Sequence, residues 1–166
     1  MTGVLRPAAP DDVPALVEVQ RVGAVRGLGH IFPQDAHPFP RDEIESRWLG
    51  EIADPDIDAY VIVDAEGRIV GFAATRRDEL LHFGTAVATW GSGLAAVAHD
   101  EVIGRLLAAG LARARLRVFE ENRRARRFYE KLGWRETGQR SQTSFPPNPV
   151  LVEYARDLSG TREAGP

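Results

Sequence analysis

The sequence predicts a mixed α/β (α+β) fold, in which helices flank one central β-sheet. Three observations support this prediction. Short apolar segments typical of strands are interspersed with segments whose apolar residues recur every three or four positions, as in amphipathic helices. The segment 114–119 alternates apolar and charged residues from Ala114 to Val118. The order of the segments, with strands before, between and after the helices, indicates a sheet of mixed strand direction.

The first half of the chain is expected to supply a strand, two helices and a β-hairpin. Acid at Asp12 suits the start of the first helix, and the second helix follows Pro40. The turn Asp-Ala-Glu-Gly at 64–67 joins two apolar segments and predicts a hairpin. The expected elements are a strand at 4–6, a helix from Val13, a Gly-, Pro- and His-rich loop at 27–40, a helix at 41–53 with Ile44, Trp48 and Ile52 on one side, and strands at 60–63 and 68–74.

The second half alternates strands and helices, and most of its boundaries are marked by glycine. Gly110 is expected to close the third helix. The expected elements are a strand at 80–86, a turn at 90–93, a helix at 94–109, the strand 114–119, a helix from Asn122 to Gly133, and late strands near 140–145 and 150–154. Residues 1–158 are expected to form one domain, and 159–166 a disordered tail.

The basic segment 122–134 reads as a capped amphipathic helix. Asn122 can accept a backbone N–H at the start of the helix, and Gly133 can adopt the left-handed conformation that ends it. Ala125, Phe128, Tyr129 and Leu132 follow at the spacing of one buried face. The Arg and Lys residues are expected to face outward, as a solvated surface.

The turn Gly91-Ser92-Gly93 joins a strand to a helix. Unpaired N–H groups and the helix dipole at such a helix start suit a phosphate group, although most such turns bind nothing. A dinucleotide-binding domain that uses this turn is disfavoured, because no acidic residue ends a strand about 20 residues further on.

The composition excludes several classes of function. A net charge of −3 gives no general affinity for nucleic acid or acidic membrane surfaces. The absence of cysteine excludes disulfides, a thiol nucleophile and Cys-ligated zinc, and the four histidines lack metal-ligand spacing, so no metal site is expected. No apolar segment reaches the roughly 18 residues of a membrane span, and no signal-peptide pattern is present, so we expect a cytoplasmic protein without a membrane partner.

The turn and the basic helix together resemble the GNAT superfamily of N-acetyltransferases. The motif spans residues 83–134 without a gap, and the resemblance extends more loosely over 4–155. Trp90 stands where the family usually has Arg or Gln, Val87 where it often has Pro, and Ala98 and His99 where it has large apolar residues. The motif is carried by Trp90, Gly91, Ser92, Gly93, Leu94, Ala95, Gly110, Leu116, Val118, Asn122, Ala125, Phe128, Tyr129, Gly133 and Trp134.

The resemblance implies a splayed sheet of six to seven strands with about four helices, and acetyl transfer from acetyl-CoA to an amine. The turn would bind the pyrophosphate, the pantetheine arm would lie between two parting strands, and an N–H near Thr85 or Ala86 would stabilise the oxyanion. The implied acetyl-CoA contacts are Phe83, Gly84, Thr85, Trp90, Gly91, Ser92, Gly93, Leu94, Ala95, Ala96, Asn122, Ala125 and Phe128.

Tyr129 occupies the position of the family's general acid, near the sulfur of CoA. A phenol is protonated at neutral pH and can donate to the departing thiolate. The base stays open between Glu79, where many relatives have a carboxylate or a water-held base, and ordered water. His82 is interpreted as an ordinary strand residue or as part of the acceptor site.

The acceptor site is expected at the loop 27–40. His30 and Phe32 either line the amine site or only pack the loop. Arg140 is expected on the opposite side, His99 and Glu101 on a polar helix surface, and the Arg cluster at 123–127 either in solvent or at the 3′-phosphate of CoA. The alternative function is a catalytically silent acyl-CoA-binding module. The acceptor, a small molecule or a protein amine, is left unidentified, and a homodimer is left open.

Overall fold

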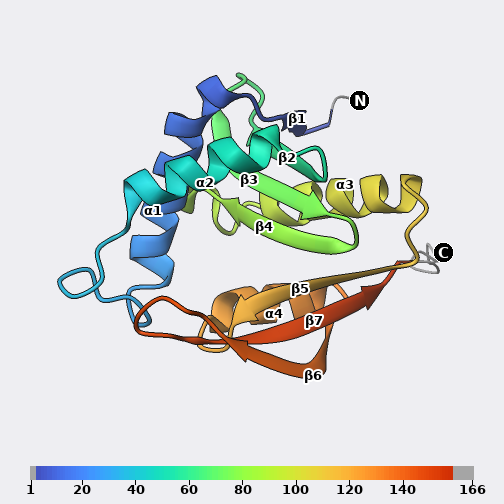
Figure 1. Ribbon diagram of the computed structural model, residues 1–166. Helices are drawn as coiled ribbons and strands as arrows, with labels where there is room; N and C mark the ends of the chain where they lie inside the picture. Colours follow the sequence, from blue (N-terminus) through green and yellow to red (C-terminus); the bar gives the residue numbers. More distant parts are fainter. Residues whose placement is uncertain (1–2, 159–166) are drawn as a thin grey trace.

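The computed structural model describes residues 3–158, which form a seven-stranded sheet flanked by helices (Figure 1). The strand order is β1-β2-β3-β4-β5-β7-β6. Only β4 and β5 run parallel; every other neighbouring pair is antiparallel, so the sheet is mixed as predicted. The strands are β1 (Leu5–Pro7), β2 (Ile57–Val63), β3 (Ile69–Arg76), β4 (Glu79–Thr85), β5 (Arg113–Phe119), β6 (Arg135–Gln142) and β7 (Val150–Asp157).

Four α-helices cover the two faces of this sheet among the described residues. The pair α1 and α2 packs on one face, and the pair α3 and α4 on the other (Figure 1). None of the helices in 3–158 has the length and apolar character that crossing a membrane requires. The helices are α1 (Val13–Gly27), α2 (Arg41–Ala53), α3 (Leu94–Ala108) and α4 (Arg123–Lys131), with short 3₁₀ turns at Pro10–Asp12 and Val87–Thr89. The predicted tail at 159–166 lies outside the described residues.

Each face of the sheet has its own apolar core. Under α1 and α2, Leu16, Val17 and Trp48 are fully buried against β2, β3 and β4. Under α3 and α4, the core includes Leu116 of β5 and Trp134 just after α4. The apolar residues whose helical spacing predicted these helices are therefore buried, on two separate faces of the sheet.

His99 corrects the expectation of a polar surface on α3. Its side chain is fully buried. The indole N–H of Trp134 donates to His99 Nε2 at 2.9 Å, and Nδ1 lies 3.0 Å from the Asp100 carboxylate. Burial lowers the pKa of His99, so the ring stays neutral, with Nδ1 as donor and Nε2 as acceptor. A histidine with both nitrogens bonded thus takes the place of the apolar side chain that the family usually has there.

Glu101 also differs from that expectation. Its carboxylate accepts the backbone N–H of Val4 at 2.8 Å and that of Leu5 at 3.3 Å. Those amides lie at the start of the edge strand β1, which pairs with β2. Glu101 therefore ties the amino-terminal strand to α3.

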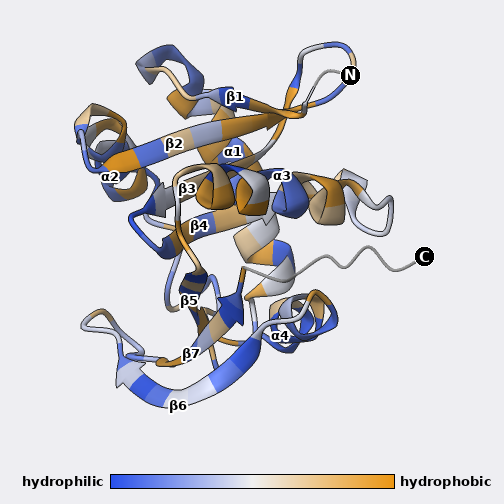
Figure 2. Ribbon diagram, turned by 90° about the vertical axis from the view of Figure 1, so that its right-hand side faces the viewer, coloured by the Kyte–Doolittle hydropathy of each residue, from blue (hydrophilic) through white to orange (hydrophobic). Residues whose placement is uncertain are grey.

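The position of β6 was wrong in the sequence-based prediction. The strand covers Arg135–Gln142, whereas a strand near 140–145 was expected. β6 is the outer strand of the sheet, and nearly all its residues are exposed. Most of them are hydrophilic (Figure 2). A strand without a buried face has no apolar alternation, so the pattern used to find strands is missing from this segment.

Candidate active site

The parallel strands β4 and β5 separate after a short paired stretch. Only Glu79 with Arg115 and Leu80 with Leu116 are in register. Beyond these pairs, β4 continues to pair with β3 as far as Thr85, and β5 with β7 as far as Phe119. Both strands therefore keep their outer partners while their facing edges part, as the resemblance implied.

The turn after β4 depends on the backbone conformation of two glycines. Gly91 has φ of +82° and Gly93 has φ of +91°, in the left-handed region that other residues avoid. A Cβ atom on either glycine would meet no atom within 4 Å. The requirement for glycine at these positions is therefore conformational and not a matter of packing within the described residues.

Four backbone N–H groups at this turn lack an acceptor among residues 3–158. The amide of Leu94 donates to the Ser92 hydroxyl at 3.2 Å, and that of Val97 to the Gly93 carbonyl at 3.2 Å. The unpaired amides are those of Gly91, Gly93, Ala95 and Ala96. Unpaired amides at the start of a 15-residue helix, together with its dipole, fit an anionic phosphate.

Trp90 joins this turn to both β4 and α4. Its indole N–H donates to the Thr85 carbonyl at 3.0 Å. The guanidinium carbon of Arg124 lies 3.5 Å from the centroid of the Trp90 ring, a cation–π contact. Burial, and secondly the charge of Arg127, lower the pKa of Arg124. Neither arginine forms an ion pair with a carboxylate within 3–158, so part of the arginine cluster lies close to the turn with its charge uncompensated.

The edge of β4 that faces the separated part of β5 includes the amides of Phe83 and Thr85. The amide of Ala86 donates to the Val70 carbonyl at 2.8 Å, which directs it toward β3. In an antiparallel ladder such bonds alternate along the strand, so the register directs the amides of Phe83 and Thr85 away from β3. Of the two oxyanion donors predicted from the sequence, Ala86 is thus engaged and Thr85 remains.

Gly84 allows β3 and β4 to approach closely at this point. A Cβ atom there would lie 2.5 Å from the Phe72 ring. The side chain of the preceding residue, Phe83, stacks on Phe128 of α4 with ring centroids 5.9 Å apart. This contact joins β4 to α4 on the α3/α4 face of the sheet.

The predicted cap and core face of α4 are confirmed. The Asn122 side chain accepts the amide of Ala125 at 3.2 Å. Tyr129 is buried against Phe128 and Trp134. Its hydroxyl makes no hydrogen bond within the described part of the chain, and burial raises its pKa above the usual range, so the phenol stays protonated. Arg126, predicted to face outward, instead bonds the Tyr154 hydroxyl and Glu136.

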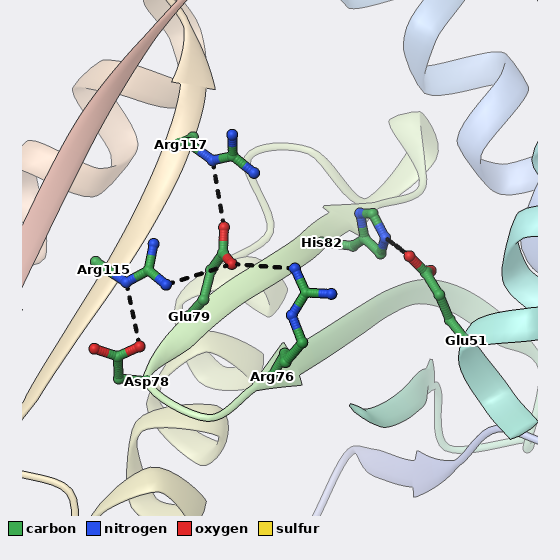
Figure 3. A network of polar contacts seen from close by, with 7 residues as sticks. All are labelled: Glu51, Arg76, Asp78, Glu79, His82, Arg115 and Arg117. Atoms are coloured by element: carbon green, nitrogen blue, oxygen red, sulfur yellow. Dashed lines mark hydrogen bonds and ion pairs between the residues drawn. The ribbon is translucent and has the colours of Figure 1, made fainter. Parts of the chain in front are cut away.

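Glu79 lies in the paired stretch of β4 and is surrounded by arginines (Figure 3). Its buried carboxylate is 3.4 Å from Arg117, 3.7 Å from Arg76 and 3.8 Å from Arg115. These side chains come from β3 and β5, so the cluster joins three neighbouring strands where the sheet is still closed. The arrangement gives Glu79 a structural role in addition to the catalytic role predicted from the sequence.

His82 pairs with Glu51, a residue that the sequence analysis did not single out. The ring nitrogen Nε2 of His82 lies 2.9 and 3.1 Å from the two carboxylate oxygens (Figure 3). Trp48 packs against the His82 ring at 4.9 Å between centroids. Glu51 follows Trp48 by three positions and so shares its helix face, which is the one signal in the sequence that could have indicated it.

The loop 28–40 packs against the carboxyl end of β5. His30 Nε2 lies 2.8 Å from the Glu121 carbonyl, to which it donates. Phe32 contacts Phe119 at 5.4 Å and Phe145 at 6.1 Å between ring centroids. Arg140 forms an ion pair with Glu120. The loop is thus held by packing contacts, and the acceptor role of His30 and Phe32 stays a prediction.

The candidate residues lie on opposite faces of the sheet. Leu116 and Val118 of β5 belong to the core under α3 and α4, where Tyr129 also lies. Arg115 and Arg117 alternate with them and therefore point to the other face, as does Glu79, which they bind. His82 is on that second face too, because it contacts α2. In the described range, no group of three or more His, Asp or Glu side chains is arranged to hold a metal ion.

Comparisons with known proteins agree on one family and one fold. A family model described as the acetyltransferase (GNAT) family matches residues 26–134. No curated protein sequence matches the chain significantly. Among solved structures, YjaB from Escherichia coli has a TM-score of 0.72 at 19% identity, covering 93% of this chain and 97% of that one.

Two further structures contain CoA. Spermidine N-acetyltransferase from Vibrio cholerae, in complex with CoA and spermine, has a TM-score of 0.71 at 18% identity, over 93% of this chain and 95% of that one. PaiA N-acetyltransferase from Thermoplasma acidophilum, in complex with coenzyme A, has a TM-score of 0.70 at 16% identity, over 95% and 99%. At such identities the likeness is one of fold.

Proposed function

Because this chain belongs to the acetyltransferase (GNAT) family, we propose that it transfers an acetyl group from acetyl-CoA to a primary amine of a small molecule or a protein. One observation carries the proposal: β4 and β5 part directly before a turn with four amides that lack an acceptor in the described residues. These two features supply a place for an extended acyl carrier and a site for its phosphates.

The turn would hold the pyrophosphate of acetyl-CoA through its backbone. The amides of Gly91, Gly93, Ala95 and Ala96 need an acceptor, and the dipole of α3 favours negative charge there. Arg124 lies beside the turn on Trp90 and adds a positive charge. These groups bind through geometry and charge, and they carry out no bond-making step.

The parted edge of β4 would hold the pantetheine arm. Amide and carbonyl groups at the edge of a strand can bond an extended ligand as they would a further strand. The amides of Phe83 and Thr85 are directed to this edge, which makes them the candidate donors to the thioester oxygen. A donor fixed in the main chain is preorganised for the negative charge that develops during the reaction.

Tyr129 would donate a proton to the departing sulfur. Burial keeps its phenol protonated, and no partner in 3–158 competes for the hydroxyl. The predicted base, Glu79, is bound to three arginines, and these contacts already engage its carboxylate. The silent acyl-CoA-binding alternative needs no proton donor at this position.

The decisive experiment combines binding with turnover. Calorimetry should detect binding of acetyl-CoA to the full chain. Release of free CoA thiol should then depend on an added primary amine, taken from a panel of spermidine, spermine, amino acids and short peptides, with the acetylated product identified by mass spectrometry. Binding without amine-dependent thiol release would leave the silent module as the function, and lack of binding would contradict both.

A further inference from the structure

We infer that His82, oriented by Glu51, takes the proton from the acceptor amine. The inference rests on the proposed acetyl transfer and assigns the base that this reaction needs. A primary amine is mostly protonated at neutral pH, and it must lose a proton before its lone pair can attack a carbonyl.

A β-bulge determines on which face of the sheet the His82 side chain lies. Ala74 of β3 is opposite His82, but the next residue, Thr75, is opposite Leu80, so Leu81 is an extra residue in β4. Bulges change the direction in which the side chains of a strand point and occur often beside active sites. Here the bulge puts His82 on the face covered by α1 and α2, opposite the face that holds Tyr129.

The position of His82 along β4 also fits this role. The last residue of β4 in register with β5 is Leu80, so His82 lies two residues beyond the point where the strands begin to part. Phe83, whose amide is directed to the parted edge, is the next residue. Glu79, in contrast, lies within the closed stretch.

The contact with Glu51 determines which nitrogen of His82 is available. Both oxygens of the Glu51 carboxylate lie within 3.1 Å of Nε2, so Nε2 carries the hydrogen and donates it. Nδ1 then keeps its lone pair and has no partner among residues 3–158. A carboxylate that orients an imidazole, and stabilises it once protonated, is the arrangement found in many general bases.

The surroundings of His82 shield the pair without closing it off. Trp48 covers one side of the ring, and the side chains of His82 and Glu51 are each 16% exposed. The side chain of Glu79 is only 5% exposed, and its carboxylate already contacts Arg76, Arg115 and Arg117. The charged groups near the pair are Arg47, which interacts with Glu51 on α2, and the arginine cluster around Glu79 on the same face.

Each proton in the reaction is accounted for, with His82 on one face of the sheet and Tyr129 on the other. Nδ1 of His82 accepts one proton from the ammonium group, and the freed nitrogen forms a C–N bond to the thioester carbon. As the C–S bond breaks, its electron pair leaves with sulfur, which takes a proton from Tyr129. The second proton of the attacking nitrogen restores the phenol, and His82 releases its proton to water. The products are an amide, free CoA and one proton.

The test compares His82→Gln with the wild type on amines of different basicity. The best acceptor of the panel is used together with ethylamine and 2,2,2-trifluoroethylamine, which have similar size but differ in basicity. We expect kcat for the strongly basic amines to fall by about 100-fold, with KM and acetyl-CoA affinity unchanged. The loss should stay within about threefold for trifluoroethylamine, which is largely unprotonated at neutral pH.

Two further variants separate a proton-transfer role from a structural one. His82→Ala should regain activity on the strongly basic amines when imidazole is added. Glu51→Gln, which changes a positioning residue, should lower kcat by about tenfold at constant KM. Glu66→Gln, on the exposed hairpin turn, serves as the matched control and should behave as the wild type.

The outcomes distinguish this inference from the proposed function. Full turnover of His82→Gln on a strongly basic amine, or an equal loss on both classes of amine without imidazole rescue of His82→Ala, would overturn the role of His82 alone. A wild-type protein that acetylates no amine of the panel would overturn the proposed function, and this inference with it.

Discussion

The guanidinium carbon of Arg124 lies 3.5 Å from the ring centroid of Trp90 and so joins α4 to the turn that precedes α3. We expect Arg124→Gln to weaken acetyl-CoA binding roughly 5- to 30-fold, since a cation–π contact and a charge beside the phosphates are lost together. Calorimetry at low and high salt measures this, and the difference between variant and wild type should shrink at high salt. Arg123→Gln is the control, because its side chain is 76% exposed and paired with Glu121. Equal losses in both variants would contradict a specific role for Arg124.

Gly93 provides a test of the turn itself. Gly93→Ala places a Cβ on a residue with φ of +91°, which costs about 1–2 kcal/mol of stability or shifts the turn and weakens acetyl-CoA binding. Gly104→Ala in α3 has open space and helical geometry, so it should stabilise the protein by about 0.5–1 kcal/mol. Thermal unfolding and calorimetry on both variants check this pair. Unchanged binding and stability in Gly93→Ala would contradict the proposed role of the turn.

Tyr129→Phe separates catalysis from binding. We expect kcat to fall by about 100-fold while acetyl-CoA affinity is kept, because only the proton donor is removed. Stability should change little, since the hydroxyl has no hydrogen bond within 3–158. Tyr154→Phe is the converse control: it loses contacts with Glu130 and Arg126, so it should lower stability by about 1 kcal/mol and leave kcat unchanged. Full turnover of Tyr129→Phe would remove the proposed acid.

Glu79→Gln distinguishes between Glu79 and His82 as the general base. If Glu79 joins the strands, the variant should lose stability because its contacts with the three arginines are weakened. The loss should be only about 1–2 kcal/mol, because the guanidinium groups are partly exposed and regain water. Its kcat should stay near the wild-type value. Chemical unfolding and steady-state kinetics measure the two effects. A fall in kcat of about 100-fold at unchanged stability would support Glu79 as the base, as the sequence suggested.

His99 should make stability depend on pH. Burial lowers its pKa in the folded state below the ordinary value of 6.5, an effect that Asp100 opposes and Arg156 reinforces. Below pH 6.5 the unfolded chain therefore binds a proton that the folded chain does not, and stability falls as the pH decreases. His99→Gln keeps an acceptor for Trp134 and removes this titration. Its Tm should fall less than that of the wild type between pH 7 and pH 5; an identical fall would contradict the assignment.

Local patterns predicted the order of the elements and much of the candidate site. The cap at Asn122, the burial of Tyr129 and the glycine turn after β4 depend on residues that are neighbours in the sequence. Such features follow from turn chemistry and helical spacing alone. The parting of β4 from β5 was implied by the family resemblance, since no local pattern encodes the separation of two strands.

The features that were missed depend on contacts between distant segments. Glu51 meets His82 across 31 positions of the chain, and Trp134 bonds His99 across 35. In sequence, Glu51 is an ordinary helix carboxylate, and His99 is part of a polar triplet. Only the packing of α2 on β4, and of α4 beside α3, gives these side chains their partners. The predicted position of β6 was wrong because an outer polar strand has no buried face and therefore no alternation of apolar and polar residues.

The phosphate contacts proposed for the turn belong to the main chain, and this separates two kinds of evolutionary constraint. Substitutions at Ser92 or Leu94 leave the amide groups in place, provided that the residues at 91 and 93 keep their positive φ. The solved structures that share only 16–19% of their residues with this chain have the same fold. Under the proposed function, the side chains of the loop 28–40 could then change to fit new acceptors while the main-chain contacts of the turn stay the same.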